Sequence, residues 1–156
     1  MKRTPHCFVF RSYSFDLKKK HVRFTYAVTF KNEPDMEFAE NIHLPKEIDT
    51  KKIPEELLKK VLENVHLILG VSYYKLFCPA KVEVPYALTL EQAEFWTTVY
   101  RKGLGEFAFR NSLDQRKFAK FPSKRGAIAA TVNCPRKNHS LLGIGGGKDS
   151  IVAGEL

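Results

Sequence analysis

A glycine run near the carboxyl end of the sequence has the residue types and spacing of a phosphate-binding loop. A polar segment follows it directly, giving the order Gly145-Gly146-Gly147-Lys148-Asp149-Ser150. The residues before it, 140–144, are mostly apolar and predict a buried strand. Backbone without side chains lets an anion approach closely, and the N–H groups at a helix start point toward it. A helix starting at Lys148 would thus complete a phosphate site, whereas a glycine turn without ligand remains the alternative.

Two common phosphate loops do not fit this spacing. A Walker-type loop needs a glycine where Leu142 stands and a hydroxyl residue where Asp149 stands. A dinucleotide fingerprint needs its third glycine where Lys148 stands. The segment instead resembles the Ser-Gly-Gly-x-Asp-Ser loop of N-type ATP pyrophosphatases, with Gly145 in place of the first serine.

That resemblance implies ATP and Mg²⁺ as cofactors and a grip on the pyrophosphate released when ATP is cleaved between its α- and β-phosphates. It implies pyrophosphate contacts for four residues, Gly145, Gly146, Gly147 and Ser150. Lys148 would lie near the phosphate charge, and Asp149 would be a helix cap or a magnesium contact.

Three segments, in this order, extend the resemblance to nearly the whole chain. They are Gly70-Val71-Ser72-Tyr73-Tyr74-Lys75, Gly103-Leu104-Gly105-Glu106-Phe107-Ala108-Phe109-Arg110-Asn111 and residues 143–150. Together they resemble the N-terminal part of the bacterial UDP-N-acetylmuramoyl-L-alanyl-L-glutamate epimerase family. The resemblance implies an isomerase of peptidoglycan precursor synthesis that uses ATP and Mg²⁺ to invert the terminal L-glutamate of UDP-MurNAc-L-Ala-L-Glu to the D form.

The implied chemistry is consistent with an ATP-cleaving loop. A proton next to a carboxylate is hard to remove because the product would be a dianion, and conversion of the carboxylate to an acyl-adenylate removes that charge. Five residues are candidates for substrate or pyrophosphate contacts or for purely structural roles: Tyr74, Lys75, Glu106, Arg110 and Asn111. The catalytic base is not assigned.

The elements that must position these residues indicate an α+β fold. Alternating apolar residues predict antiparallel strands over 7–16, 21–30 and 36–44, with a short edge strand at 81–85. Their shared buried face would carry Phe8, Phe10, Val22, Phe24, Tyr26, Val28 and Phe30.

Two long helices should pack on this sheet. The first, from Pro54 to about Phe77, has a period of 3.6 and should bury one stripe, Leu58, Val61, Leu62, Val65, Ile68, Leu69 and Tyr73. The second begins after Thr89, with Gln92 completing a capping box, and should direct its aromatic residues into the core: Phe95, Trp96 and Tyr100. Residues 106–111 should continue it after a glycine interruption.

The chain divides at about residue 139. Residues 1–139 should form the α+β domain, with a basic linker at 116–125 near its end, and 140–156 the first strand, loop and helix of a truncated α/β nucleotide-binding domain of ATP-pyrophosphatase type. A helix of two turns is marginal alone. We therefore expect a fragment of such an epimerase that is inactive by itself.

Composition limits the alternatives. The chain has 26 Lys+Arg against 17 Asp+Glu, a net charge of +9, which favours anionic ligands. We expect a cytoplasmic protein because no apolar run is long enough to span a bilayer. Dispersed histidines predict no metal site from protein ligands, and the three cysteines should be buried thiols.

A non-catalytic basic module that binds nucleic acid or an anionic metabolite remains the second hypothesis. It rests on Lys18-Lys19-Lys20 and the basic segment 116–125, although nucleic acid is the weaker choice.

Overall fold

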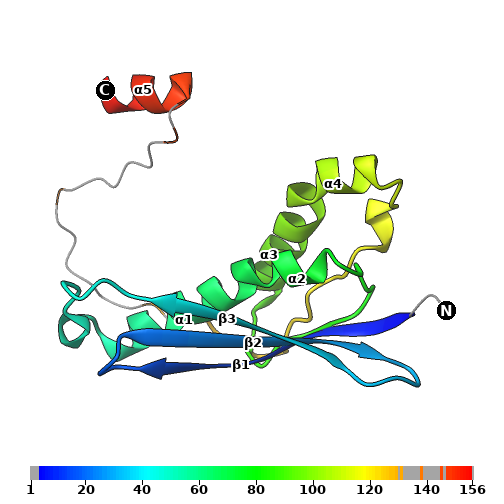
Figure 1. Ribbon diagram of the computed structural model, residues 1–156, viewed down its shortest axis with the longest axis horizontal. Coiled ribbons are helices and arrows are strands. Elements are labelled where there is room, and N and C mark those ends of the chain that lie inside the picture. The colour runs from blue at the N-terminus through cyan, green and yellow to red at the C-terminus, as the bar shows by residue number, and fades with distance from the viewer. Residues whose placement is uncertain (1–3, 130, 132–137, 139–144, 146, 156) are drawn as a thin grey trace.

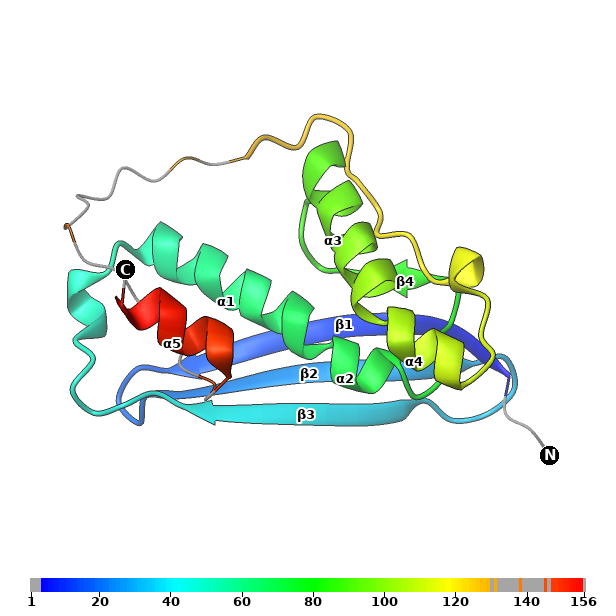
Figure 2. The ribbon, with the colours of Figure 1, turned by 90° about the horizontal axis from the view of Figure 1, so that it is seen from above.

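The computed structural model describes residues 4–129, 131, 138, 145 and 147–155. A four-stranded sheet forms one layer, with strand order β3-β2-β1-β4. Its strands are β1 (Pro5–Asp16), β2 (His21–Phe30), β3 (Met36–His43) and β4 (Val82–Glu83). One face of the sheet is covered by helices (Figure 1, Figure 2): α1 (Glu55–Leu69), α2 (Val71–Tyr74), α3 (Leu90–Gly103) and α4 (Gly105–Arg110). The predicted α+β class is confirmed.

The alternating pattern of the first strands builds the buried face of the sheet. β1 and β2 pair antiparallel, with Phe8 opposite Val28 and Phe10 opposite Tyr26. All seven residues predicted for this face are buried. An irregularity in β1 between Phe10 and Ser12 then shifts the alternation by one residue, as a β-bulge does. Even-numbered residues contact the core before the bulge, and Tyr13 and Phe15 contact it afterwards.

β4 makes the sheet mixed. It pairs parallel to β1, with Phe8 opposite Val82. The edge strand expected at 81–85 is present, but the expectation of an antiparallel sheet is wrong for this strand. The chain reaches β4 through two further strands and two helices, and a connection of that length allows a strand to enter in the parallel sense.

The first long helix is divided at Gly70 into α1 and α2. A Cβ atom at Gly70 would lie 2.4 Å from Cε1 of Phe10 and 3.0 Å from the hydroxyl of Tyr100. The helix therefore passes directly over the sheet at a point where no side chain fits. The prediction of one helix to Phe77 is wrong, because α2 ends at Tyr74.

The buried face of α1 also differs from the predicted stripe. Val61 and Ile68 are 48% and 44% exposed, although both were expected in the core. Glu63, His66 and Leu67 are buried instead. The helix is rotated relative to the predicted stripe, so it buries a histidine and a glutamate and leaves an apolar strip in solvent.

Buried tyrosines connect the end of α1 to the rest of the fold. The Tyr26 hydroxyl donates a hydrogen bond from β2 to the carbonyl of His66 (3.1 Å), and the Tyr100 hydroxyl donates one from α3 to the carbonyl of Leu67 (2.7 Å). The backbone of α1 just before the break at Gly70 is thus held by hydrogen bonds from the sheet on one side and from α3 on the other.

The start of α3 follows the sequence prediction. The Thr89 hydroxyl accepts from the backbone of Gln92, and the Gln92 side chain accepts from the backbone of Thr89, which completes the capping box. Trp96 and Tyr100 are buried as predicted. Phe95 is 58% exposed, so its predicted place in the core is wrong; its ring makes an edge contact with that of Trp96.

The basic segment 116–125 is part of the core layer and not a linker. Phe118, Ala119 and Phe121 are buried, and the backbone N–H of Phe121 donates to the hydroxyl of Thr97 (3.0 Å). The prediction of a linker is therefore wrong for these residues. Apolar residues that lie between the basic ones pack against the core. The proposed domain boundary at 139/140 stays a prediction.

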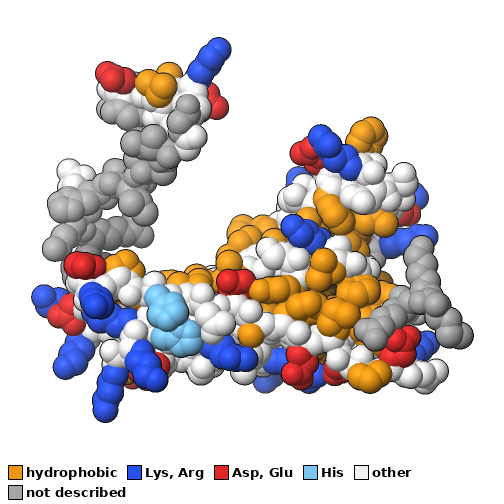
Figure 3. All heavy atoms as spheres, in the orientation of Figure 1, with side chains coloured by type: hydrophobic (Ala, Val, Ile, Leu, Met, Phe, Trp, Pro, Cys, Tyr) orange, Lys and Arg blue, Asp and Glu red, His pale blue; other side chains and the backbone are white. Residues whose placement is uncertain are grey.

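The turn between β1 and β2 is organised by its own side chains. Asp16 accepts hydrogen bonds from the backbone N–H groups of Lys18 and Lys19. The Lys20 ammonium donates to the carbonyls of Lys46 and Ile48, so it ties this turn to the segment before α1. Lys and Arg side chains gather at this end of the sheet (Figure 3).

The two cysteines in the described part of the chain are unreactive. Burial raises the pKa of the Cys7 and Cys78 thiols to about 11, so both stay protonated near neutral pH. Cys7 is buried as predicted and Cys78 is half-buried, whereas Cys134 lies outside the described residues. Within the residues described, every helix is too short or too polar to cross a bilayer.

Candidate functional site

The predicted phosphate loop leads into a helix as the sequence indicated. α5 (Lys148–Glu155) begins directly after Gly147, and the backbone N–H of Gly145 donates to the hydroxyl of Ser150 (3.1 Å). Lys148 and Asp149 are exposed in the first turn, where a helix has N–H groups without intrahelical partners. Gly146 and the strand expected at 140–144 lie outside the described residues.

Gly147 has no steric reason to be glycine. A Cβ atom there would meet no described atom within 4 Å, and the backbone does not require the left-handed conformation. A side chain at this position would instead extend into the space beside the helix start. The arrangement therefore suits an anion approaching the backbone, which is the chemistry that the loop pattern predicts.

The five predicted substrate contacts do not converge on one point. The Tyr74 side chain is fully buried; its hydroxyl donates to the carbonyl of Pro79 (3.1 Å) and accepts from the backbone N–H of Ala119 (2.9 Å). Burial raises its pKa. This environment argues for a structural role, because both hydrogen-bonding directions of the hydroxyl are used within the core.

The other four candidates are exposed. Glu106 and Arg110 pair with each other on α4 at 2.8 Å, and the Asn111 amide donates to the carbonyl of Phe107 at the end of that helix. Lys75 follows α2 and is exposed. The structure brings together Glu106 and Arg110 alone of the five, and their exposure leaves both free to exchange this contact for a ligand.

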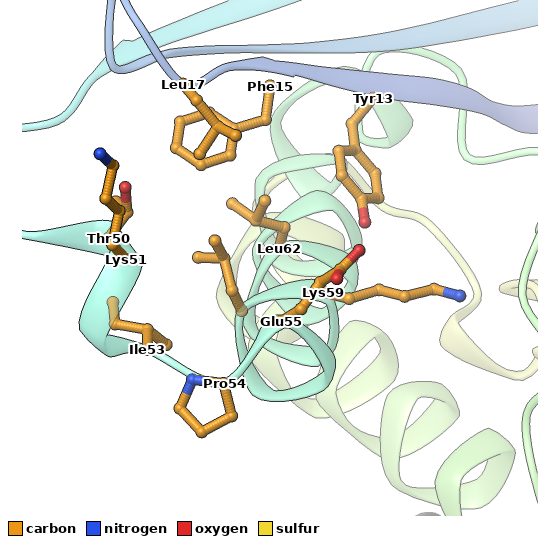
Figure 4. A pocket seen from close by; sticks show the side chains of 11 residues that line it. Tyr13, Phe15, Leu17, Thr50, Lys51, Ile53, Pro54, Glu55, Lys59 and Leu62 are labelled. Carbon is orange, nitrogen blue, oxygen red and sulfur yellow. The ribbon is translucent and has the colours of Figure 1, made fainter.

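A groove of about 790 Å³, which the sequence did not reveal, lies where β1 ends and α1 begins. The β1 bulge turns Tyr13 and Phe15 toward it, and Leu17 follows from the turn. Figure 4 shows Phe15 and Leu17 opposite Leu62 of α1, with Ile53 and Pro54 closing the far side. Its volume is that of a small-molecule site, which ranges over roughly 300–1,000 Å³.

The rim of this groove carries mixed charge with a cationic excess. Lys51 and Lys59 lie at the rim with Glu55 (Figure 4). Neither lysine belongs to an ion pair with another described residue, whereas nearby Lys60 pairs with Glu63 at 2.8 Å. An apolar floor with unpaired ammonium groups at the edge suits an anionic ligand that also has an apolar part.

A buried polar cluster beside the groove centres on His66, which sequence reasoning missed. Its Nε2 lies 3.1 Å from the backbone carbonyl of Thr25, so Nε2 must carry the proton. Nδ1 then accepts from the Tyr86 hydroxyl at 2.5 Å. Burial among aromatic rings lowers the pKa of His66 to about 4, which keeps the ring neutral at physiological pH. The available signal was its spacing, four residues after buried Leu62 on the same helix face.

Comparison with known proteins shows the family. A family model described as the MurL N-terminal domain matches residues 1–156. The chain belongs to the MurL N-terminal domain family. The family resemblance predicted from the three sequence segments is therefore confirmed.

Curated relatives agree with this assignment to the MurL N-terminal domain family. A Salinispora tropica protein named UDP-N-acetyl-alpha-D-muramoyl-L-alanyl-L-glutamate epimerase is 40% identical over 154 residues, which cover 94% of this chain and 32% of that protein. Proteins of the same name are 37% identical over 150 residues in a Micromonospora strain and 40% identical over 97 residues in Xanthomonas oryzae pv. oryzae; these matches cover 94% and 62% of this chain and 33% and 22% of the relatives.

The chain thus spans about a third of the length of the Salinispora relative. No solved structure matches it.

Proposed function

We propose that this MurL N-terminal domain acts in an ATP- and Mg²⁺-dependent epimerase that converts the terminal L-glutamate of UDP-MurNAc-L-Ala-L-Glu to the D form during peptidoglycan precursor synthesis. The family match over residues 1–156 carries the proposal. The relatives' names supply the substrate and the reaction.

The loop at 145–150 would hold the pyrophosphate. ATP would supply the activation: it would convert the glutamate carboxylate to an acyl-adenylate with release of pyrophosphate, which would let a base remove the α-proton before the proton returns to the opposite face and water releases the carboxylate and AMP. The space beside Gly147 and the exposed Lys148 support a phosphate contact here, and Asp149 supplies a carboxylate for Mg²⁺.

The groove between β1 and α1 would receive part of the anionic substrate. Its apolar floor suits the less polar parts of the nucleotide-sugar peptide, and Lys51 and Lys59 complement its phosphates and carboxylates. The sequence showed positive charge only as a net excess over the whole chain, whereas the structure places at this groove two lysines that are unpaired among the described residues.

A fusion protein tests this function. Residues 1–156 replace the matched third of the Salinispora tropica relative, and the product is assayed for AMP release and, by chiral chromatography, for D-glutamate. We expect conversion that requires ATP and Mg²⁺, and no conversion by residues 1–156 alone. Conversion without ATP, or turnover by the isolated chain, would contradict the proposal.

A pair of glycine variants isolates the loop. In the fusion, Gly147→Val should abolish AMP release because the side chain occupies the space proposed for pyrophosphate. Gly103→Val is the matched control, since a Cβ there also meets no described atom within 4 Å. Equal activity of the two variants would remove the loop from the proposed site.

The second hypothesis is a non-catalytic basic module that binds nucleic acid or an anionic metabolite, and its nucleic-acid form has weaker support. Outward positions paired across three strands carry small side chains, Ser12, Thr25 and Ala39, which offer no ring on which a base could stack. Anisotropy of a labelled oligonucleotide should show only weak binding; tight binding that weakens steeply as the salt concentration rises would favour this hypothesis instead.

A further inference from the structure

An apolar strip on α1 is only partly covered in the described structure. Leu57, Val61, Val65 and Ile68 follow one another at intervals of four, four and three residues, the spacing of a helix face that pairs with another element. Val61 and Ile68 are 48% and 44% exposed. The opposite side of α1 packs on the sheet, so this helix has two apolar faces of which one is covered.

The strip forms one side of a shallow groove of about 510 Å³ between α1 and α3. Trp96 of α3 lines the other side of the groove. The surface that lines the groove is almost entirely apolar. Phe95, 58% exposed, contacts the Trp96 ring with a centroid distance of 5.2 Å and extends the apolar surface. Lys60 and Asn64 supply polar atoms at its margin.

This composition is that of an interface. An apolar centre with a polar margin is typical of surfaces that another protein segment covers. Isolated exposed side chains need no explanation, but here two helices contribute to one groove. We therefore expect another protein segment to cover the strip and the groove.

We propose that the α1–α3 groove is the docking surface for the polypeptide that the epimerase relatives carry beyond the matched region. About two thirds of the Salinispora relative lies outside the match, which covers 32% of its length, and a region of that size is long enough to form a domain that covers this groove. Interfaces between domains of one chain bury roughly 600–1,500 Å². The α1–α3 groove supplies the apolar centre that such a contact needs, and it shares no lining residue with the groove proposed for substrate.

Cysteine accessibility tests the proposal. Ile68→Cys is prepared in residues 1–156 alone and in the fusion with the rest of the Salinispora relative, and its maleimide modification is followed by mass spectrometry. Lys102→Cys, exposed at the end of α3 and absent from the lining of the α1–α3 groove, is the matched control. We expect modification at position 68 to be at least tenfold slower in the fusion and modification at position 102 to be unchanged. Equal rates at position 68 in both proteins would overturn the proposal.

Two further measurements keep the result decisive. The same cysteine at the aligned position of the full-length Salinispora relative should be protected to the same degree, which removes any dependence on how well the fusion folds. Light scattering of residues 1–156 should show a monomer. A dimer that Ile68→Lys converts to monomer would assign the strip to a second copy and overturn the proposal. Because neither readout uses activity, failure here is distinct from failure of the proposed function.

Discussion

Acidification should destabilise this protein through His66. The imidazole is fully buried, its Nε2–H donates to the Thr25 carbonyl, and its Nδ1 accepts from Tyr86. Burial lowers its pKa from 6.5 to about 4. Between pH 6.5 and pH 4 the unfolded chain binds a proton at this histidine that the folded chain does not bind. Stability is therefore fully present above pH 6.5 and decreases as the pH falls toward 4.

The magnitude follows from the two pKa values. Each unit of difference corresponds to about 1.4 kcal/mol. At pH 5 the histidine of the unfolded chain is almost fully protonated and that of the folded chain is still largely neutral. Protonation of the unfolded chain therefore lowers the free energy of unfolding by roughly 2 kcal/mol relative to pH 8. Below pH 4 this loss of unfolding free energy reaches about 3 kcal/mol. That is a substantial part of the roughly 5–15 kcal/mol that stabilises a typical domain.

Urea unfolding at pH 8 and pH 5, followed by the fluorescence of the single tryptophan, Trp96, measures this effect. His66→Gln is the reference, because its amide can still donate to Thr25 but does not titrate. The other histidines and the carboxylates are common to both proteins and cancel. The wild-type chain should lose about 2 kcal/mol more than the variant between these pH values. Parallel losses in the two proteins would refute the assignment of a neutral buried His66.

Three substitutions test other parts of the structure. Gly70→Ala should destabilise the protein by roughly 1–3 kcal/mol, because its methyl group would collide with the ring of Phe10, whereas Gly103→Ala should be neutral; equal urea midpoints would contradict the close approach. Thr89→Ala should cost about 1 kcal/mol through loss of the capping box, and an unchanged midpoint would show that the cap is dispensable. In the fusion, Lys59→Glu should raise KM for the UDP-linked substrate several-fold with little change in kcat, whereas an effect on kcat alone would exclude a substrate-binding role for the groove between β1 and α1.

The local pattern of the sequence predicts the sheet and the helix start well. In β1 and β2 the alternation is nearly regular, and each large apolar residue has one possible face, so the buried set follows directly. Thr89 and Gln92 likewise act through contacts three residues apart, and sequence spacing alone determines their geometry.

The failures have a different physical origin. α1 carries apolar residues around more than half of its circumference, so periodicity does not specify which part meets the sheet. The observed rotation of α1 lets His66 form hydrogen bonds with the Thr25 carbonyl and the Tyr86 hydroxyl, which belong to distant parts of the chain. Partners this remote leave no local signature, and the same holds for the parallel pairing of β4 and for the groove between β1 and α1.

Segment 116–125 shows a further limit. Its basic residues indicated a solvated connection, yet Phe118 and Phe121 are buried. Long cationic side chains reach solvent from a backbone that packs against the core, so net charge does not report the position of the backbone.

The tyrosines that hold the end of α1 have a consequence for how the chain folds. The bonds from Tyr26 to the carbonyl of His66 and from Tyr100 to that of Leu67 join residues 40 and 33 positions apart, and the bond between Tyr74 and Ala119 joins residues 45 apart. Each bond requires two distant parts of the chain to come together first: β2 and α1, α3 and α1, or α2 and the segment that contains Ala119. Contacts of such sequence separation slow folding and make it cooperative, because loop-closure entropy is lost before the contacts form. The described fold is therefore expected to assemble and to unfold as one unit.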